Sequence, residues 1–232
     1  MGIEMLLEFE HVTGIKKQRW KKQRENFCLQ DISFSLEAGY IMGLAGENGA
    51  GKTTLIDYIM NPQQRYQGAI RIQGEDIRIN HVNMRNKVGF VSEENHFLED
   101  MTIGQNEAIL GQLYDNWDSE CFRDMLRKVG LTLGKTVGKL SRGECMKFQM
   151  AFAAAHHPVL YLLDEATAGM DPVFRIDFFK ILQEIIATEE ASVIMTSHIQ
   201  EEIDRKMDFI GIMEQGSLIQ FCEAGEKYAD RA

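Results

Sequence analysis

The segment GENGAGKT at residues 46–53 constrains the fold of this 232-residue chain more than any other feature. It fits the pattern GxxxxGK[ST], and it stands between a short apolar run at 40–45 and a stretch of helical character at 52–60. Glycine backbones can wrap around an anion and point successive N–H groups at it, and the helix adds its positive end. The segment therefore predicts a strand, a phosphate-binding loop and a helix, in that order.

Two side chains of this loop indicate a nucleoside triphosphate as the ligand. Lys52 supplies a positive charge for the β- and γ-phosphates, and the hydroxyl of Thr53 is placed to ligate Mg²⁺. A chance glycine turn before a helix is the alternative, but every fixed position of the pattern is filled and both flanks are of the required kind. The residues expected to contact the nucleotide here are Gly46, Glu47, Asn48, Gly49, Ala50, Gly51, Lys52, Thr53 and Thr54.

Strand-like and helical segments alternate toward both ends of the chain, with a long helical stretch between them. Residues 173–186 place Phe174, Phe178, Ile181 and Ile185 on one face of a helix. The alternation predicts an α/β fold with a mostly parallel sheet, and the insert predicts a second lobe. The expected strands are 29–36, 40–45, 69–72, 76–79, 87–91, 159–163, 192–196 and 209–213, and residues 103–156 are expected to be mostly helical.

A pair of acids, Asp164 and Glu165, follows the apolar run at 159–163. An acid at the tip of a buried strand is costly unless a partner neutralises it. A magnesium ion beside Thr53 would be that partner for Asp164, directly or through water. Glu165 points differently and could accept a proton from an attacking water. The alternative is that both are solvated acids at the junction of a strand and a loop.

Composition argues against several classes of protein. With 25 lysines and arginines against 35 aspartates and glutamates, the net charge is −10, which disfavours binding to nucleic acid or to an anionic bilayer. The four cysteines form no CxxC pair, which predicts a reducing compartment without a zinc site or a disulfide framework. No apolar run approaches the roughly 18 residues of a membrane span, and the acids at the N-terminus predict that this segment is not a secretion signal.

Five segments of the chain resemble, in order, the motifs of the ATP-binding subunits of ABC transporters. They are GENGAGKT at 46, LSRGE at 140, VLYLLDEA at 159, AGMD at 168 and TSH at 196. The resemblance extends over essentially the whole chain and implies a P-loop ATPase core with a mostly parallel sheet, an antiparallel β subdomain and a helical insert lobe. Residues 1–232 would form one ABC-type ATPase domain, with a RecA-like core at about 1–92 and 157–232 and a helical lobe at about 93–156.

The segment LSRGE stands where the family has its LSGGQ-type signature, which closes over the γ-phosphate of ATP bound to the opposite subunit. Ser141 and Gly143 match that motif, whereas Arg142 and Glu144 depart from it. The pattern Ser141-x-x-Glu144 is also a capping box, and a capped helix can still present its N-terminus to a phosphate.

Glu93 stands where the family's Q-loop usually has a glutamine. A carboxylate can ligate Mg²⁺ or hold the attacking water, but it cannot donate a hydrogen bond as an amide does. The alternative is a surface acid, because Glu94 follows it directly. A groove for membrane subunits lies near this point in the family, so Phe97 is either an exposed anchor for a partner or part of the lobe's core.

Three further positions take roles only through the resemblance. His198 would contact the γ-phosphate and the attacking water, and act in catalysis together with Glu165 and Lys52. Asp171 would lie at the dimer interface, or alternatively cap a helix that begins at Pro172. Trp20 is the candidate for stacking on adenine, beside a basic cluster at 16–24 that is either a solvated hairpin or a surface for an acidic partner or phospholipid head groups.

The resemblance implies that two copies, or this chain and a homologue, bind two ATP molecules with Mg²⁺ and hydrolyse them. The work would be delivered to separate integral membrane subunits at the cytoplasmic face of the cell membrane, with no role for nucleic acid. The acids in place of the Q-loop glutamine and the short C-terminal end favour export over import. One alternative is a soluble ABC-type ATPase that acts on a non-transport partner. The other is a regulatory module that binds nucleotide without hydrolysing it, which the presence of Glu165 and His198 disfavours.

Overall fold

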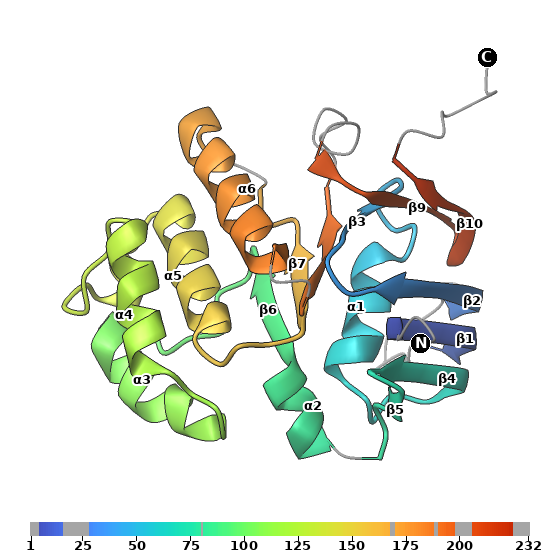
Figure 1. The fold of residues 1–232 in the computed structure, drawn as a ribbon, viewed down its shortest axis with the longest axis horizontal. Helices are drawn as coiled ribbons and strands as arrows, with labels where there is room; N and C mark the ends of the chain where they lie inside the picture. Colours follow the sequence, from blue (N-terminus) through green and yellow to red (C-terminus); the bar gives the residue numbers. More distant parts are fainter. Residues whose placement is uncertain are drawn as a thin grey trace, which may run out of the picture.

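The computed structural model describes residues 5–15, 28–79, 81–167, 170–187, 190–197 and 206–224. Within these ranges the chain forms a six-stranded sheet and a four-stranded sheet, with helix α1 (Lys52–Met60) between them (Figure 1). The six-stranded sheet has the order β10 (Ser217–Glu223), β9 (Phe209–Glu214), β3 (Ile41–Ala45), β8 (Ser192–Thr196), β7 (Leu160–Asp164) and β6 (Val88–Ser92). The four-stranded sheet has the order β2 (Cys28–Glu37), β1 (Met5–Ile15), β4 (Tyr66–Ile72) and β5 (Glu75–Asp76).

The six-stranded sheet is parallel except for its edge strand β10, whereas the four-stranded sheet is antiparallel throughout. The predicted α/β fold with a mostly parallel sheet and an antiparallel β subdomain is therefore confirmed. In the parallel ladders Ser92 is opposite Asp164 and Leu44 is opposite Thr196. The carboxyl ends of β3, β6, β7 and β8 consequently meet at one edge of the sheet.

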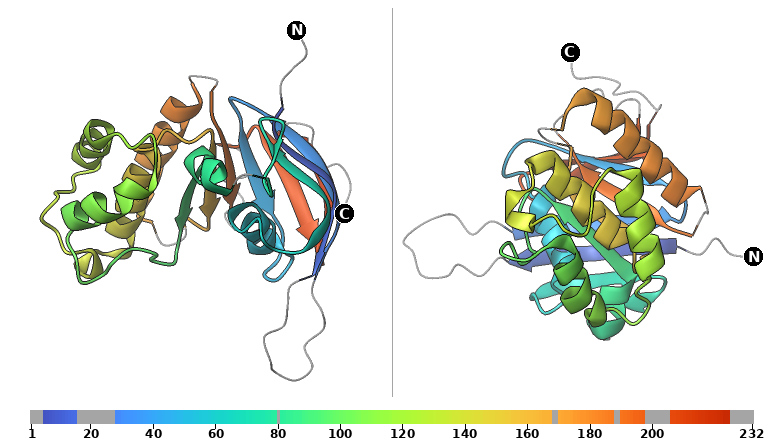
Figure 2. Two further views of the ribbon diagram at one scale, coloured as in Figure 1. Left: turned by 90° about the horizontal axis from the view of Figure 1, so that it is seen from below. Right: turned by 90° about the vertical axis from the view of Figure 1, so that its left-hand side faces the viewer.

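Further α-helices follow α1 along the described residues. They are α2 (His81–Lys87), α3 (Ile103–Leu110), α4 (Ser119–Lys128), α5 (Arg142–Ala154) and α6 (Pro172–Ile186), with short 3₁₀ turns η1 (Gly111–Leu113) and η2 (Val137–Lys139). Of these, α5 and α6 pack on the sheet, while α3 and α4 lie beyond α5 at one end of the molecule (Figure 2). Among the described residues no helix combines the length and the apolar composition that crossing a bilayer requires.

Three apolar clusters hold these layers together. The first fills the space between the two sheets around α1, and the second joins the opposite face of the parallel sheet to α5 and α6. Strands β3 and β8 are buried along their whole length, as their continuous apolar runs predict. The predicted face of α6 is confirmed, because Phe174 and Phe178 are buried and Ile181 and Ile185 pack against the second cluster.

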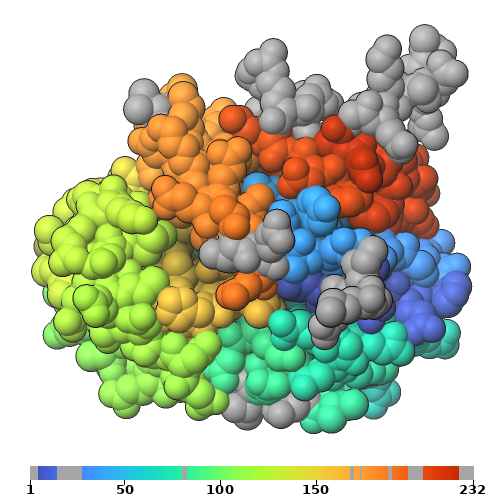
Figure 3. All heavy atoms as spheres, viewed as in Figure 1, coloured from blue at the N-terminus to red at the C-terminus, as the bar shows by residue number. Residues whose placement is uncertain are grey.

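The third cluster belongs to the helical lobe, by which we mean residues 93–156. All of its fully buried members lie between Ile103 and Ala155. This separate core supports the lobe boundaries that we propose at 92/93 and 156/157. The lobe forms the left-hand end of the molecule in the view of Figure 3. Phe97 packs on Phe148 and Phe152, with ring centroids 4.4 Å and 4.9 Å apart, so the interpretation that it packs with the lobe's core is confirmed. Its side chain is half-buried, and its role as an anchor for a partner stays a prediction.

The sequence patterns missed β1, β10 and α2, and they placed β4 and β5 too far along the chain. In β1 the register shifts between Met5 and Leu7 and again after Phe9, which destroys the alternation that identifies a strand. Leu6 and Leu7 are both buried as a result. Edge strand β10 is half-buried at most positions, so it carries no clear alternation either.

Helix α5 is fixed to the edge of the sheet by buried polar groups. Gln149 accepts a hydrogen bond from the backbone N–H of Ser92 at 3.0 Å and donates one to its carbonyl at 2.9 Å. After the helix, the Nε2 of His156 donates to the carbonyl of Val88 at 3.2 Å, and the ring of Tyr114 stacks on the imidazole. His156 is 1% exposed, and this burial lowers its pKa from 6.5 to about 4.

The pKa of His156 links the stability of the junction to pH. The imidazole of His156 takes up a proton near pH 4 in the folded state but near pH 6.5 in the unfolded state. The contribution of neutral His156 to stability is therefore complete above pH 6.5 and is lost as the pH falls from 6.5 toward 4. We expect His156 to account for a loss of about 3 kcal/mol in the free energy of unfolding over this range. Urea unfolding at several pH values measures it.

The matched variant is His156→Leu, which removes the titrating group. It should be less stable than the wild type at pH 7.5, because the hydrogen bond to Val88 is lost. It should also lose less stability on acidification. An identical pH dependence in the two proteins would contradict the assignment.

Candidate nucleotide-binding site

The loop between β3 and α1 depends on its glycines for its shape. Gly46, Gly49 and Gly51 have φ angles of 144°, 85° and 114°, which side chains with a Cβ rarely adopt. A Cβ on Gly46 would also lie 2.3 Å from the carbonyl oxygen of Met213. At Gly49, by contrast, no atom lies within 4 Å of a Cβ position, so the tip of the loop is open to a ligand.

Lys52 lies beneath this loop with a side chain that is almost fully buried. Its Nζ donates to the carbonyls of Gly46 at 2.6 Å and Glu47 at 3.0 Å, which holds the loop curved over the start of α1. Burial lowers the pKa of Lys52, and the charges of Glu165 and Asp164 oppose that shift. The ammonium therefore stands close to two carboxylates and at the start of a helix.

The first turn of α1 is the other anion-binding element of the loop. Its N-cap, Gly51, has no side chain that could accept from the helix N–H groups, which is the arrangement that favours an anionic ligand. The N–H of Ala50 donates to the carbonyl of Glu47 at 3.1 Å, so this amide is engaged within the loop. The predicted loop residues 46–54 are thus brought together, and their contacts with ATP stay predictions.

The predicted acids lie at the carboxyl edge of the sheet, next to the loop. The Oδ1 of Asp164 accepts from the hydroxyl of Thr196 at 2.8 Å and from the hydroxyl of Thr53 at 3.3 Å. The same hydroxyl of Thr196 accepts from the backbone N–H of Glu165 at 2.8 Å. Glu165 has a φ of 51°, so the chain turns sharply directly after β7.

Thr196 is the residue that sequence reasoning missed. It is fully buried at the end of β8, and its one hydroxyl joins both predicted acids. Its only signal in the sequence is its place in the TSH segment beside His198. A threonine at the end of a buried strand is otherwise ordinary, because β-branched residues are common there.

The side chains at this edge fit a magnesium ion. A threonine hydroxyl and a carboxylate are the hard oxygen ligands that Mg²⁺ takes in combination with phosphate oxygens and waters. Thr53 and Asp164 approach each other closely enough to share one ion. They are the two residues that we expect to hold it.

The segment LSRGE begins α5, and the predicted capping box is confirmed. The hydroxyl of Ser141 accepts from the N–H of Glu144 at 3.2 Å, and the Glu144 carboxylate accepts from the N–H of Ser141 at 3.0 Å. Glu144 also pairs with Lys135, and these partners lower its pKa. Gly143 lies in the first turn with open space around it. The role of Ser141 and Gly143 toward ATP stays a prediction.

Two other predicted site residues have partners in the structure. The Oε2 of Glu93 lies 3.1 Å from the Nη2 of Arg142, so this carboxylate is directed to α5. Asp171 caps α6 by accepting from the N–H of Phe174 at 2.9 Å, directly before Pro172. The helix-cap interpretation of Asp171 is therefore confirmed, while its place at a dimer interface and the metal role of Glu93 stay predictions.

Trp20 and His198 lie outside the described residues, as does the basic cluster at 16–24. Their predicted contacts with adenine, with the γ-phosphate and with acidic partners therefore stay predictions.

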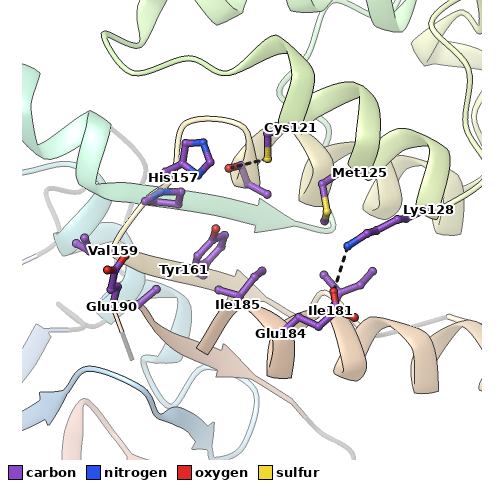
Figure 4. A pocket seen from close by; sticks show the side chains of 13 residues that line it. Cys121, Met125, Lys128, His157, Val159, Tyr161, Ile181, Glu184, Ile185 and Glu190 are labelled. Atoms are coloured by element: carbon purple, nitrogen blue, oxygen red, sulfur yellow. Dashed lines mark hydrogen bonds and ion pairs between the residues drawn. The ribbon is translucent and has the colours of Figure 1, made fainter. Parts of the chain in front are cut away.

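A cavity of about 310 Å³ lies away from these motifs, between α4, α6 and the start of β7 (Figure 4). Apolar side chains such as Met125, Tyr161 and Ile185 line it, and Lys128 reaches Glu184 at 3.2 Å between the two helices. None of the predicted nucleotide-site residues lines this cavity. It belongs to the junction of the lobe with α6 and not to the candidate site.

Comparisons with known proteins agree with the fold. Residues 29–168 match the family model of the ABC transporter, and the chain belongs to this family. It is 30% identical over 201 residues to the ABC transporter ATP-binding protein YtrB of Bacillus subtilis, covering 87% of this chain and 68% of YtrB. It is 29% identical to the bacitracin transport ATP-binding protein BcrA of Bacillus licheniformis, covering 82% of this chain and 62% of BcrA.

Solved structures give the same result. One described as the ATP-binding subunit of an ABC transporter superposes with a TM-score of 0.82 and 25% identity, covering 94% of this chain and 90% of that one. The chain is therefore an ABC-type ATPase domain.

The double role of the Thr196 hydroxyl can be tested by Thr196→Val, which keeps the shape of the side chain. We expect ATP hydrolysis to fall at least about tenfold, because Asp164 and Glu165 lose their common partner. The dissociation constant of ATP should change less than about threefold, because the loop and Lys52 are untouched. Steady-state kinetics and nucleotide titration measure the two effects.

Thr196→Ser is the matched control, since it retains the hydroxyl and should keep most of the activity. Turnover of Thr196→Val at the wild-type rate would show that the hydroxyl does not position these acids.

Proposed function

We propose that this chain is a magnesium-dependent ATP hydrolase subunit that powers an ABC transporter. The observation that carries the proposal is the convergence of Lys52, Thr53, Asp164 and Glu165 at one edge of the parallel sheet. Lys52 and Thr53 come from the start of α1 and Asp164 and Glu165 from the end of β7, and each has the chemistry that phosphoryl transfer requires.

The mechanism assigns a role to each group at this edge. The loop N–H groups and Lys52 bind the β- and γ-phosphates, and the lysine replaces its carbonyl partners with phosphate oxygens. A magnesium ion held by Thr53 and Asp164 would neutralise charge on the same phosphates. Glu165, oriented through its N–H by Thr196, accepts the proton of the water that attacks the γ-phosphorus, and ADP and phosphate leave. His198 would stabilise the developing charge.

Dimerisation follows from the family's use of the signature. In the family, this segment closes over the ATP of the opposite subunit, and here Ser141 and Gly143 stand exposed or half-exposed at the N-terminus of α5. A second copy or a homologous chain would complete each site. Integral membrane subunits would receive the work at the cytoplasmic face of the membrane, with export as the proposed direction.

The relatives' names support transport in general terms. BcrA is described as a bacitracin transport protein, and this chain spans only 62% of its length. We therefore do not propose bacitracin as the substrate for this chain. Recovery of the chain from detergent-solubilised membranes with a hydrophobic partner tests the transporter assignment. Recovery without any such partner would favour a soluble ABC-type ATPase instead.

Glu165→Gln tests the base, because it keeps the size of the side chain and removes its ability to accept the proton. We expect turnover to fall about 100-fold or more, with ATP binding retained and an ATP-bound dimer accumulating. Light scattering after gel filtration with and without ATP measures the dimer. Full hydrolysis by this variant would overturn the assignment of Glu165.

Lys52→Ala tests the loop. Loss of a buried ammonium that donates to phosphate should weaken ATP binding about 10- to 100-fold. Lys139→Ala, which removes an exposed lysine from the helical lobe, is the matched control and should bind ATP normally. Normal ATP binding by Lys52→Ala would contradict the phosphate-binding role of the loop.

A further inference from the structure

Two departures from the family's motifs contact each other in this structure. Arg142 stands in the signature where the family has a glycine, and Glu93 stands in the Q-loop where it has a glutamine. The Nη2 of Arg142 lies 3.1 Å from the Oε2 of Glu93, and this ion pair joins the start of α5 to the end of β6. The substitutions are 49 positions apart in the chain and meet only in the folded protein.

The backbone beside Glu93 is held by the same helix face. Gln149, which is 1% exposed, binds both the N–H and the carbonyl of Ser92. Arg142 and Gln149 are seven residues apart, which is about two turns of helix, so their side chains project from one face of α5. The helix therefore fixes the main chain at 92 through a buried amide and the carboxylate at 93 through a guanidinium.

The charge at position 93 matters because of where β6 ends. Ser92 is opposite Asp164 in the parallel ladder, so Glu93 leaves the sheet at the same edge as Asp164 and Glu165. A glutamate in place of a glutamine adds a third negative charge to the edge that faces a triphosphate. Without compensation, that charge would repel the nucleotide.

We propose that Arg142 is a positioning residue, which holds the Glu93 carboxylate against α5 and neutralises its charge. This makes a carboxylate at position 93 compatible with an anionic nucleotide at the neighbouring sheet edge. The inference rests on the proposed function for the identity of the nucleotide. It assigns to Arg142 an effect on binding that acts through Glu93 and not through direct contact with ATP.

The test is a cycle of four proteins: the wild type, Arg142→Ala, Glu93→Gln and the double variant. The readout is the dissociation constant of ATP at equilibrium, with EDTA present so that metal binding does not enter. At low ionic strength Arg142→Ala should weaken ATP binding about three- to tenfold, because Glu93 is left uncompensated. With Gln at position 93 the same arginine substitution should change the constant less than twofold.

Two controls separate this effect from a general loss of structure or charge. Arg142→Lys keeps the positive charge and should bind ATP with most of the wild-type affinity. Lys139→Ala removes another positive charge three residues earlier and should leave the affinity within twofold. The weakening in Arg142→Ala should also shrink in about 0.5 M salt, which screens exposed charges but leaves folding contacts intact. Circular dichroism confirms that each variant is folded.

The outcomes distinguish this inference from the function it rests on. If the wild type binds no more ATP than Lys52→Ala, the proposed function fails. If the wild type binds ATP and Arg142→Ala weakens binding equally with Glu or Gln at position 93, Arg142 acts on the nucleotide itself and the inference is wrong. It is also wrong if Arg142→Ala binds ATP as the wild type does.

Discussion

Lys52 carries a positive charge in a side chain that is only 6% exposed, and much of the surrounding structure serves to accommodate it. Two loop carbonyls accept its hydrogen bonds, and two carboxylates at the end of β7 act on it electrostatically. The hydroxyl of Thr196 from the neighbouring strand in turn holds the carboxylate of Asp164 and the backbone N–H of Glu165. A charge removed from water requires such partners, so the loop, the strand ends and the helix start depend on one another.

The parts of the site that the sequence predicts are those whose residues are close together in the chain. The glycine loop, Lys52 and Thr53 form one continuous segment, and Asp164 and Glu165 follow directly on a buried strand. The patterns of β3, β7, β8 and α6 are equally local, which is why their positions are confirmed to within a residue or two.

The contacts that the sequence does not predict depend on register between distant segments. Thr196 reaches Asp164 because β7 pairs with β8. Gln149 reaches Ser92 because α5 packs on β6. Neither residue is unusual in its own segment. Strand β1 was missed for another reason, since its bulges remove the periodicity on which the prediction depends.

The backbone of Glu165 limits which residues this position can accept. A φ of 51° is a conformation that asparagine, aspartate and glycine adopt more readily than other residues, and that β-branched side chains adopt only with strain. Replacement by valine, isoleucine or threonine would disturb the turn after β7 as well as remove the carboxylate. The position is therefore restricted twice, by the chemistry of its carboxylate and by the geometry of its backbone.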